Sequence, residues 1–244
     1  LAIATLASPV WSETIDDFVI REGLYYLKFT ENVFSGQVEG RVQGTLEEGV
    51  WEDYYIEYYE TGHRKLKGNY RNGKKEGIWS YFDKGSTLKT KTFYKNGIKE
   101  GIYEEYNENG LLTSKGHFKN GEREDIWEEY NENGQLSRKV SFKNGREGLS
   151  NLYSNDGQLL SKGFMKYGQK NGAWEHYYDT GELRLKTSYE FDLENGPCEE
   201  YYKNGLLNAR GNFESGIPVG LWDVFNKDGT LKETVTFKDG VKVK

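Results

Sequence analysis

Histidine, which often carries catalysis or binds metal ions, is rare and scattered in this chain. Its three histidines, His63, His117 and His176, occupy unrelated positions, and no His-Glu-x-x-His pair, phosphate-binding glycine loop or nucleophile elbow accompanies them. The segment from Glu129 to Gly134 begins like a calcium loop, but Val140 stands where the last acidic ligand is required. We therefore predict a protein that is not an enzyme and that binds no metal ion and no cofactor.

Tyrosine offers a second kind of chemistry, which is the recognition of another protein. Its large, rigid ring and its hydroxyl anchor many protein interfaces. Successive side chains of a strand point to opposite faces, so one ring of each tyrosine doublet must point away from the other. The alternative is that these rings only fill the structure. The predicted partner-binding residues are the three doublets and the histidine beside one of them: Tyr58, Tyr59, His176, Tyr177, Tyr178, Tyr201 and Tyr202.

A short repeat runs through most of the chain and positions these side chains. An aromatic residue or methionine precedes each turn of the Lys-Asn-Gly type, and the spacing is constant except for one shorter step, from Phe142 to Met165. A regular period of about 24 residues indicates a stacked array of one small unit rather than a globular enzyme domain. The members of the series are Tyr70, Tyr94, Phe118, Phe142, Met165, Tyr189, Phe213 and Phe237.

Each repeat is typical of a β-hairpin. Runs rich in aromatic and β-branched residues alternate with glycine turns, and Asn-Gly or Asp-Gly pairs supply the positive φ that tight turns need. A glycine every dozen residues argues against helices. The predicted fold is all-β, an elongated antiparallel β-meander of about eight hairpin repeats with no substantial helix and strands of about five or six residues. Residues 50–244 form this array, and residues 13–49 form an N-terminal cap and a first irregular repeat.

The first strand of each repeat carries a large residue at a fixed offset, which predicts a thin aromatic core. Trp79, Trp127 and Trp174 occupy this slot, whereas Ser150 and Cys198 leave it without a ring. Because Cys198 is the single cysteine, it forms no intramolecular disulfide, and we predict a small core residue there, with a reactive thiol as the alternative. A second ring follows three residues later, so that either both faces carry rings or a bulge brings the two series together.

The N-terminal residues and the net charge indicate where the protein is located and which partners it excludes. Residues 1–12 are apolar and rich in small residues, which predicts a signal-peptide remnant and an exported protein, in the periplasm or at the cell surface; without a signal the protein is cytoplasmic. No later stretch is long and apolar enough to span a bilayer. The formal net charge is −6, and the lysines are spread through the turns without an evident stripe, so we expect no nucleic-acid partner.

The repeat is similar to a known family. Glu76-Gly-Ile-Trp-Ser-Tyr-Phe82 and the segment from Tyr103 to Gly121 resemble the MORN-repeat variant found in bacterial proteins of the YwqK-like toxin–antitoxin system antitoxin family. The resemblance covers roughly residues 34–240. It implies a β-hairpin array with a non-catalytic binding role. The departures from the pattern are Asp125, Ser150, Cys198 and the segment 190–194, which replaces a Lys-Asn-Gly loop and predicts a local bulge or a partner contact.

Three functions follow as hypotheses. The first is a protein-interaction module or scaffold, the second an antitoxin or immunity protein that neutralises a cognate toxin, and the third a MORN protein associated with a membrane surface. The net charge of −6 opposes the third, because anionic lipids repel it. The sequence leaves the partner and the oligomeric state open, and a monomer is compatible with it.

Overall fold

The computed structural model describes residues 12–243, so residues 1–11 of the predicted signal segment lie outside the described part. The prediction of an all-β fold is confirmed: the described chain contains strands and a single 3₁₀ turn, η1 (Ile15–Asp17). Contacts divide the chain into two compact units, which are described separately. Unit 1 comprises residues up to 112 together with 118–121, and unit 2 comprises residues 113–117 and 122 onward, so that strand β11 (Leu112–Lys119) is divided between them.

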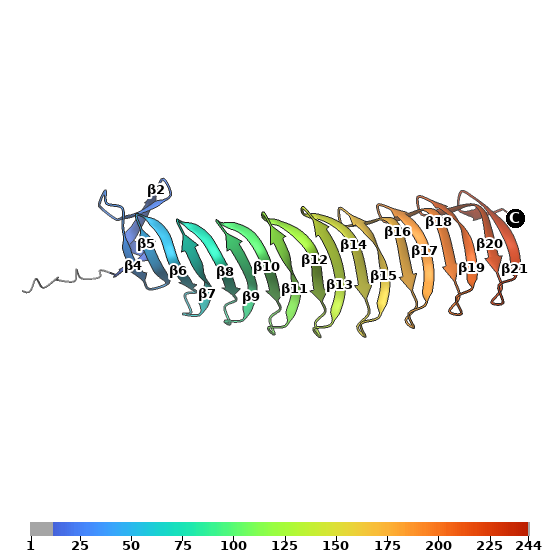
Figure 1. The fold of residues 1–244 in the computed structure, drawn as a ribbon, viewed down its shortest axis with the longest axis horizontal. Coiled ribbons are helices and arrows are strands. Elements are labelled where there is room, and N and C mark those ends of the chain that lie inside the picture. Colours follow the sequence, from blue (N-terminus) through green and yellow to red (C-terminus); the bar gives the residue numbers. More distant parts are fainter. Residues whose placement is uncertain (1–11, 244) are drawn as a thin grey trace, which may run out of the picture. The chain divides into compact units, whose positions relative to one another are not determined.

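Unit 1 begins with short strands and continues as hairpins (Figure 1). β2 and β3 form a separate two-stranded sheet, and β1 runs parallel to β4. Phe18, Val38, Val42, Leu46 and Trp51 form a buried cluster beneath these strands. From β4 onward consecutive strands pair antiparallel. The strands are β1 (Ser12–Thr14), β2 (Phe18–Arg21), β3 (Leu24–Leu27), β4 (Gly36–Glu39), β5 (Val42–Glu47), β6 (Val50–Tyr58), β7 (Arg64–Arg71), β8 (Lys74–Phe82), β9 (Leu88–Lys95) and β10 (Ile98–Tyr106).

Unit 2 is an antiparallel meander in which each strand pairs with the next in the chain. Two-residue turns join its hairpins at the upper edge of Figure 1, and longer loops join the strands at the lower edge. The strands are β12 (Glu122–Tyr130), β13 (Leu136–Lys143), β14 (Arg146–Tyr153), β15 (Leu159–Lys166), β16 (Gln169–Tyr177), β17 (Leu183–Glu190), β18 (Leu193–Tyr201), β19 (Leu207–Glu214), β20 (Ile217–Phe225), β21 (Leu231–Lys238) and β22 (Val241–Lys242).

The strands are longer than the sequence predicted. Most have eight or nine residues rather than five or six. The prediction was wrong because the glycine before each core slot, such as Gly77 or Gly172, lies inside a strand and not at its end. It has a left-handed φ of 67° or 89° and the register shifts beside it, so it forms a β-bulge.

The core is a row of side chains that crosses the strands of each unit on one face, called here the inner face. Trp79, Trp127 and Trp174 are between 0% and 1% exposed, which confirms the predicted aromatic slots. Each indole lies against a glycine of the preceding strand, and a Cβ built on Gly163 would be 2.3 Å from Trp174 Cδ2. The bowed strands (Figure 1) fold this face inward, so a single-layered sheet can bury it.

Smaller side chains alternate with the tryptophans along the row. Val140 pairs with Ser150, and Thr187 pairs with Cys198, between the strands that carry tryptophan. Cys198 is buried, as predicted for a core residue, and burial raises the pKa of its thiol to about 11. Both faces carry rings: Tyr201 donates its hydroxyl to Glu199, the neighbour of Cys198 that points to the outer face.

Candidate partner-binding surface

The predicted tyrosine doublets contribute to the structure of the array. The second ring of each doublet donates its hydroxyl to a backbone carbonyl of the following hairpin: Tyr59 to Phe82 O at 2.9 Å, Tyr178 to Tyr201 O at 2.7 Å and Tyr202 to Phe225 O at 2.8 Å. The first ring bonds to a polar side chain, so that Tyr58 reaches Gln43, Tyr177 reaches Glu175 and Tyr201 reaches Glu199. The bonds of the second rings therefore connect each doublet to the following hairpin.

The doublets do not converge on one site. Tyr58 and Tyr59 belong to unit 1, where they line two shallow cavities of about 370 and 380 Å³ together with Arg41 and Glu60. Tyr177, Tyr178, Tyr201 and Tyr202 belong to unit 2. Their role in binding stays a prediction.

His176 lies on the inner face and is half-buried. Its ring stacks on Trp174 with the centroids 5.9 Å apart, and Tyr189 Oη lies 3.4 Å from its Nε2. Burial, with Lys170 and Arg184 nearby, lowers the pKa of the imidazole to about 4. The ring is therefore neutral at pH 7 and packs as an aromatic side chain.

Four tight turns are held by a carboxylate of the preceding repeat, which binds the N–H of the turn asparagine. Glu76 Oε2 accepts the Asn96 N–H at 2.9 Å, and the same bond recurs in each of the next two repeats. We call it the glutamate clamp. It accounts for the glutamate in the repeated Glu-Gly element, because the carboxylate satisfies a turn N–H that has no strand partner. The clamps are Glu52 to Asn72, Glu76 to Asn96, Glu100 to Asn120 and Glu124 to Asn144.

The one shorter repeat has a visible consequence in β14. This strand has eight residues, whereas β12 and β16 have nine, and its bulge holds one residue fewer: Glu147 and Ser150 face Phe142 and Val140, while in β18 Glu194 and Cys198 face Tyr189 and Thr187. In place of an indole, Arg138 donates from Nε to Ser150 Oγ at 3.1 Å and forms ion pairs of 3.5 Å with Glu129 and Glu147.

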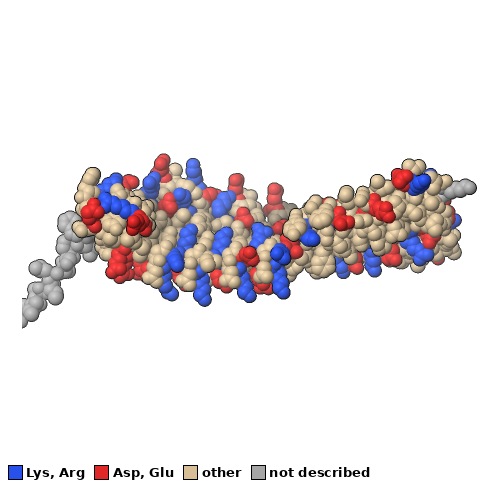
Figure 2. All heavy atoms as spheres, turned by 90° about the horizontal axis from the view of Figure 1, so that it is seen from above, with Lys and Arg blue, Asp and Glu red and all other residues tan. Residues whose placement is uncertain are grey.

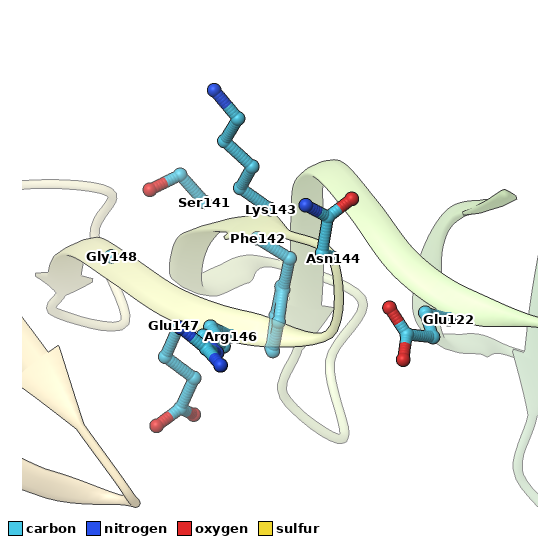
Figure 3. A pocket seen from close by; sticks show the side chains of 8 residues that line it. All are labelled: Glu122, Ser141, Phe142, Lys143, Asn144, Arg146, Glu147 and Gly148. Atoms are coloured by element: carbon cyan, nitrogen blue, oxygen red, sulfur yellow. The ribbon is translucent and has the colours of Figure 1, made fainter.

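A cavity of about 710 Å³ opens beside this shortened strand (Figure 3). Figure 3 shows Ser141 and Lys143 pointing to one side of β13 and Phe142 to the other, as strand alternation requires. The polar groups therefore do not converge on one point, which a catalytic site would require. The lining residues are Glu122, Ser141, Phe142, Lys143, Asn144, Arg146, Glu147 and Gly148.

Two turns of unit 2 carry a bulky residue in place of the turn asparagine; in one of them Glu147 still accepts a turn N–H, that of Gly168, at 2.9 Å. Tyr167 and Phe191 occupy the left-handed turn position that asparagine fills elsewhere, with φ of 55° and 48°. Asparagine tolerates this conformation, whereas bulky side chains are strained in it. Tyr167 is 80% exposed and Phe191 43% exposed. Lys166 Nζ lies 5.6 Å from one ring centroid and 5.8 Å from the other, and so links the two turns.

Apolar side chains extend this surface along the same edge. Leu193 and Ile217 each follow a tight turn and are 53% and 45% exposed. Leu193 lies against the next turn, where a Cβ on Gly216 would be 3.8 Å from its Cδ2. Figure 2, which views the molecule from above Figure 1, shows mostly uncharged atoms over the C-terminal hairpins. We name Tyr167, Phe191, Leu193 and Ile217 the aromatic edge.

Sequence reasoning found this surface only in part. The segment 190–194 is predicted as a bulge or a partner contact, and it carries Phe191 and Leu193. Tyr167 was missed, although a tyrosine directly before a turn glycine, where other repeats have asparagine, was the available signal. The residue at the clamp position gave a second signal for Phe191, because Asn171 stands there in place of glutamate, as Asn195 and Val219 do in the last two repeats.

The comparisons with known proteins bear on the repeat alone. The family model of the MORN repeat variant matches residues 99–120, 126–144 and 170–190. No curated protein matches the chain. Among solved structures, a chain of the crystal structure of the GtfA/B complex bound to UDP and GlcNAc is 11% identical with a TM-score of 0.17; the match covers 51% of this chain and 22% of that one.

Residues 12–243 contain no group of three or more histidine, cysteine, aspartate or glutamate side chains placed to hold a metal ion. No helix in this range has the length and apolar character needed to cross a membrane.

Proposed function

We propose that this protein is a non-catalytic repeat scaffold that binds another protein through the aromatic edge. One observation carries the proposal: Tyr167 is 80% exposed in a left-handed turn where asparagine serves equally well in other hairpins. Backbone strain of this kind tends to occur at functional positions. Exposed aromatic rings are also costly in water and form the anchors of many protein interfaces.

The surroundings of the edge define the chemistry of the partner. Leu193 and Ile217 offer apolar area beside the rings. Glu190, Asp192 and Glu214 are exposed around Phe191 and Leu193, while Lys166 is directed to the two rings. An apolar protein segment flanked by basic residues complements this arrangement.

The test compares two double variants in cross-linked pull-downs from the native host. Y167N/F191N removes the rings and restores the asparagine of other turns. L206N/L231N is the matched control, because both leucines are exposed in unit 2 at the edge opposite the tight turns: Leu206 lies in a loop, and Leu231 begins β21 directly after one. We expect a partner that is retained by the wild type and the control and lost by Y167N/F191N. Equal retention by all three proteins would contradict the proposal.

The sequence supports two finer proposals about context. Residues 1–12 favour an exported protein, and cell fractionation with the full-length gene tests it: recovery in the cytoplasm alone contradicts export. The family resemblance favours a toxin as the partner. Rescue of growth when the toxin gene of the same locus is co-expressed would support that role, and a locus without such a gene would oppose it.

A further inference from the structure

Stacking aligns cations that the sequence shows only as scattered. Arg71, Lys95 and Lys119 end β7, β9 and β11, each directly before a tight turn of unit 1. Successive turns lie against one another: Gly97 N–H donates to Lys75 O at 2.8 Å and Gly121 N–H to Lys99 O at 2.9 Å. The prediction that the turn lysines form no stripe is therefore wrong, because the constant repeat period places equivalent positions in one line.

The three side chains are available to a ligand. All are exposed, and Lys74, across the turn from Arg71, adds a fourth exposed cation. Among the described residues none of the four forms an ion pair. The residue before each of the three, such as Tyr94, faces the core, so the cation itself points outward. Regularly spaced basic side chains stand over the N-terminal hairpins in Figure 2.

Glu76 and Glu100 form no ion pair with this line of cations. Glu76 and Glu100 lie beside it, but each clamps a turn N–H and is directed to the backbone. We name Arg71, Lys95 and Lys119 the basic comb.

We propose that the basic comb binds an extended acidic protein segment that presents one carboxylate in every three residues. Neighbouring strands lie about 4.8 Å apart, so cations separated by one hairpin of two strands are roughly 10 Å apart. A polyproline II segment advances about 3.1 Å per residue with three residues per turn, and it presents every third side chain on one side about 9.3 Å apart. The two spacings match. A line of single cations also fits a linear partner better than a flat lipid surface.

The experiment measures binding of two labelled peptides to the full chain by fluorescence anisotropy. Both contain the same numbers of glutamate and proline, but one has glutamate at every third position and the other has its glutamates in a single block. We expect tighter binding of the regular peptide, and weaker binding at 200 than at 50 mM salt, because the contacts are exposed. Equal binding of the two peptides would overturn the proposal.

Two triple variants identify the surface. R71Q/K95Q/K119Q removes the basic comb, and K28Q/K67Q/K84Q removes three exposed lysines elsewhere in unit 1 and is the control. We expect about a tenfold loss of affinity for the first and less than a twofold loss for the second, since each exposed contact contributes a small factor. Equal losses would show unspecific charge attraction, and binding to phosphatidylserine vesicles but to neither peptide would show a membrane site; either result overturns the proposal. Neither triple variant changes the aromatic edge, so the test of the proposed function is independent of this one.

Discussion

The clamped turns and the aromatic turns solve the same local problem differently. In both, a residue with positive φ reverses the chain in a tight turn. The clamped turns use asparagine and a carboxylate from the preceding repeat, as in Glu124 with Asn144. In the aromatic turns Tyr167 and Phe191 expose rings at the asparagine position. Glu147 accepts the Gly168 N–H at 2.9 Å in the Tyr167 turn, whereas Asn171 replaces the clamp glutamate of the Phe191 turn. The Phe191 turn shows that the clamp glutamate is not required to form a tight turn, which leaves the side chains of such a turn free for recognition.

The largest loss of stability should occur in both regions, because both contain a tryptophan packed against a glycine of the preceding strand. Gly68→Ala lies in the clamped region and Gly211→Ala below the aromatic edge, and a Cβ at either would be 2.3 or 2.2 Å from an indole carbon. Overpacking of this kind typically costs about 3 kcal/mol. We expect similar losses in urea denaturation followed by tryptophan fluorescence. Gly157→Ala is the control, since its Cβ meets nothing within 4 Å and only its positive φ is penalised. A loss confined to one region would break the shared-core comparison.

Substitution at the clamp position should have a different stability cost in the two regions. Glu124→Ala deprives the Asn144 N–H of its acceptor, and by analogy with a helix N-cap it should cost about 1 kcal/mol. Asn171→Ala changes the equivalent position before the Phe191 turn and should cost much less. Equilibrium urea unfolding of both variants measures the difference. Equal costs would mean that the clamp contributes nothing specific.

Replacement of an aromatic turn residue should stabilise the protein while it impairs binding. Tyr167→Asn relieves the strain of a bulky residue with a φ of 55°, for a gain of about 0.5 kcal/mol. Asn144→Tyr is the reciprocal change in a clamped turn and should destabilise by a similar amount. Thermal unfolding of the two variants checks the opposite signs. A destabilised Tyr167→Asn would show that the ring is structural.

The smallest effect should appear in the pH dependence of unit 2. The folded-state pKa of His176 is lowered to about 4, below its ordinary value of 6.5, so the unfolded chain binds more protons between these values. Stability should therefore fall as the pH falls from 6.5 to 4. Because the ring is only half-buried, the effect is modest, and His176→Gln should remove it. Urea midpoints at pH 7 and pH 5 for both proteins test this, and an identical pH dependence of the two would contradict the assigned pKa.

Periodicity and turn chemistry were sufficient to predict the hairpin array, and the offset of Trp79 and Cys198 predicted the core row. Strand length was not predictable in the same way, because Gly77 forms a bulge within a strand where a local pattern suggests a boundary. The tyrosine doublets were predicted to bind a partner because the sequence does not show their structural role. Their hydroxyls bond to backbone carbonyls of the next hairpin, and these contacts exist only when the repeats are stacked. The basic comb was missed for the same reason: equivalent positions of successive repeats become neighbours only when the repeats are stacked.

The alternation of large and small side chains along the core row limits how many hairpins such an array can gain or lose at once. Trp79, Trp127, Trp174 and Trp222 occur in every second repeat, so the indoles recur with each pair of hairpins rather than with each one. Loss or duplication of a single hairpin would bring two indole slots, or two slots without an indole, side by side. Loss or duplication of a pair would keep the order of large and small residues. Gene rearrangements that preserve folding should therefore add or remove hairpins in twos.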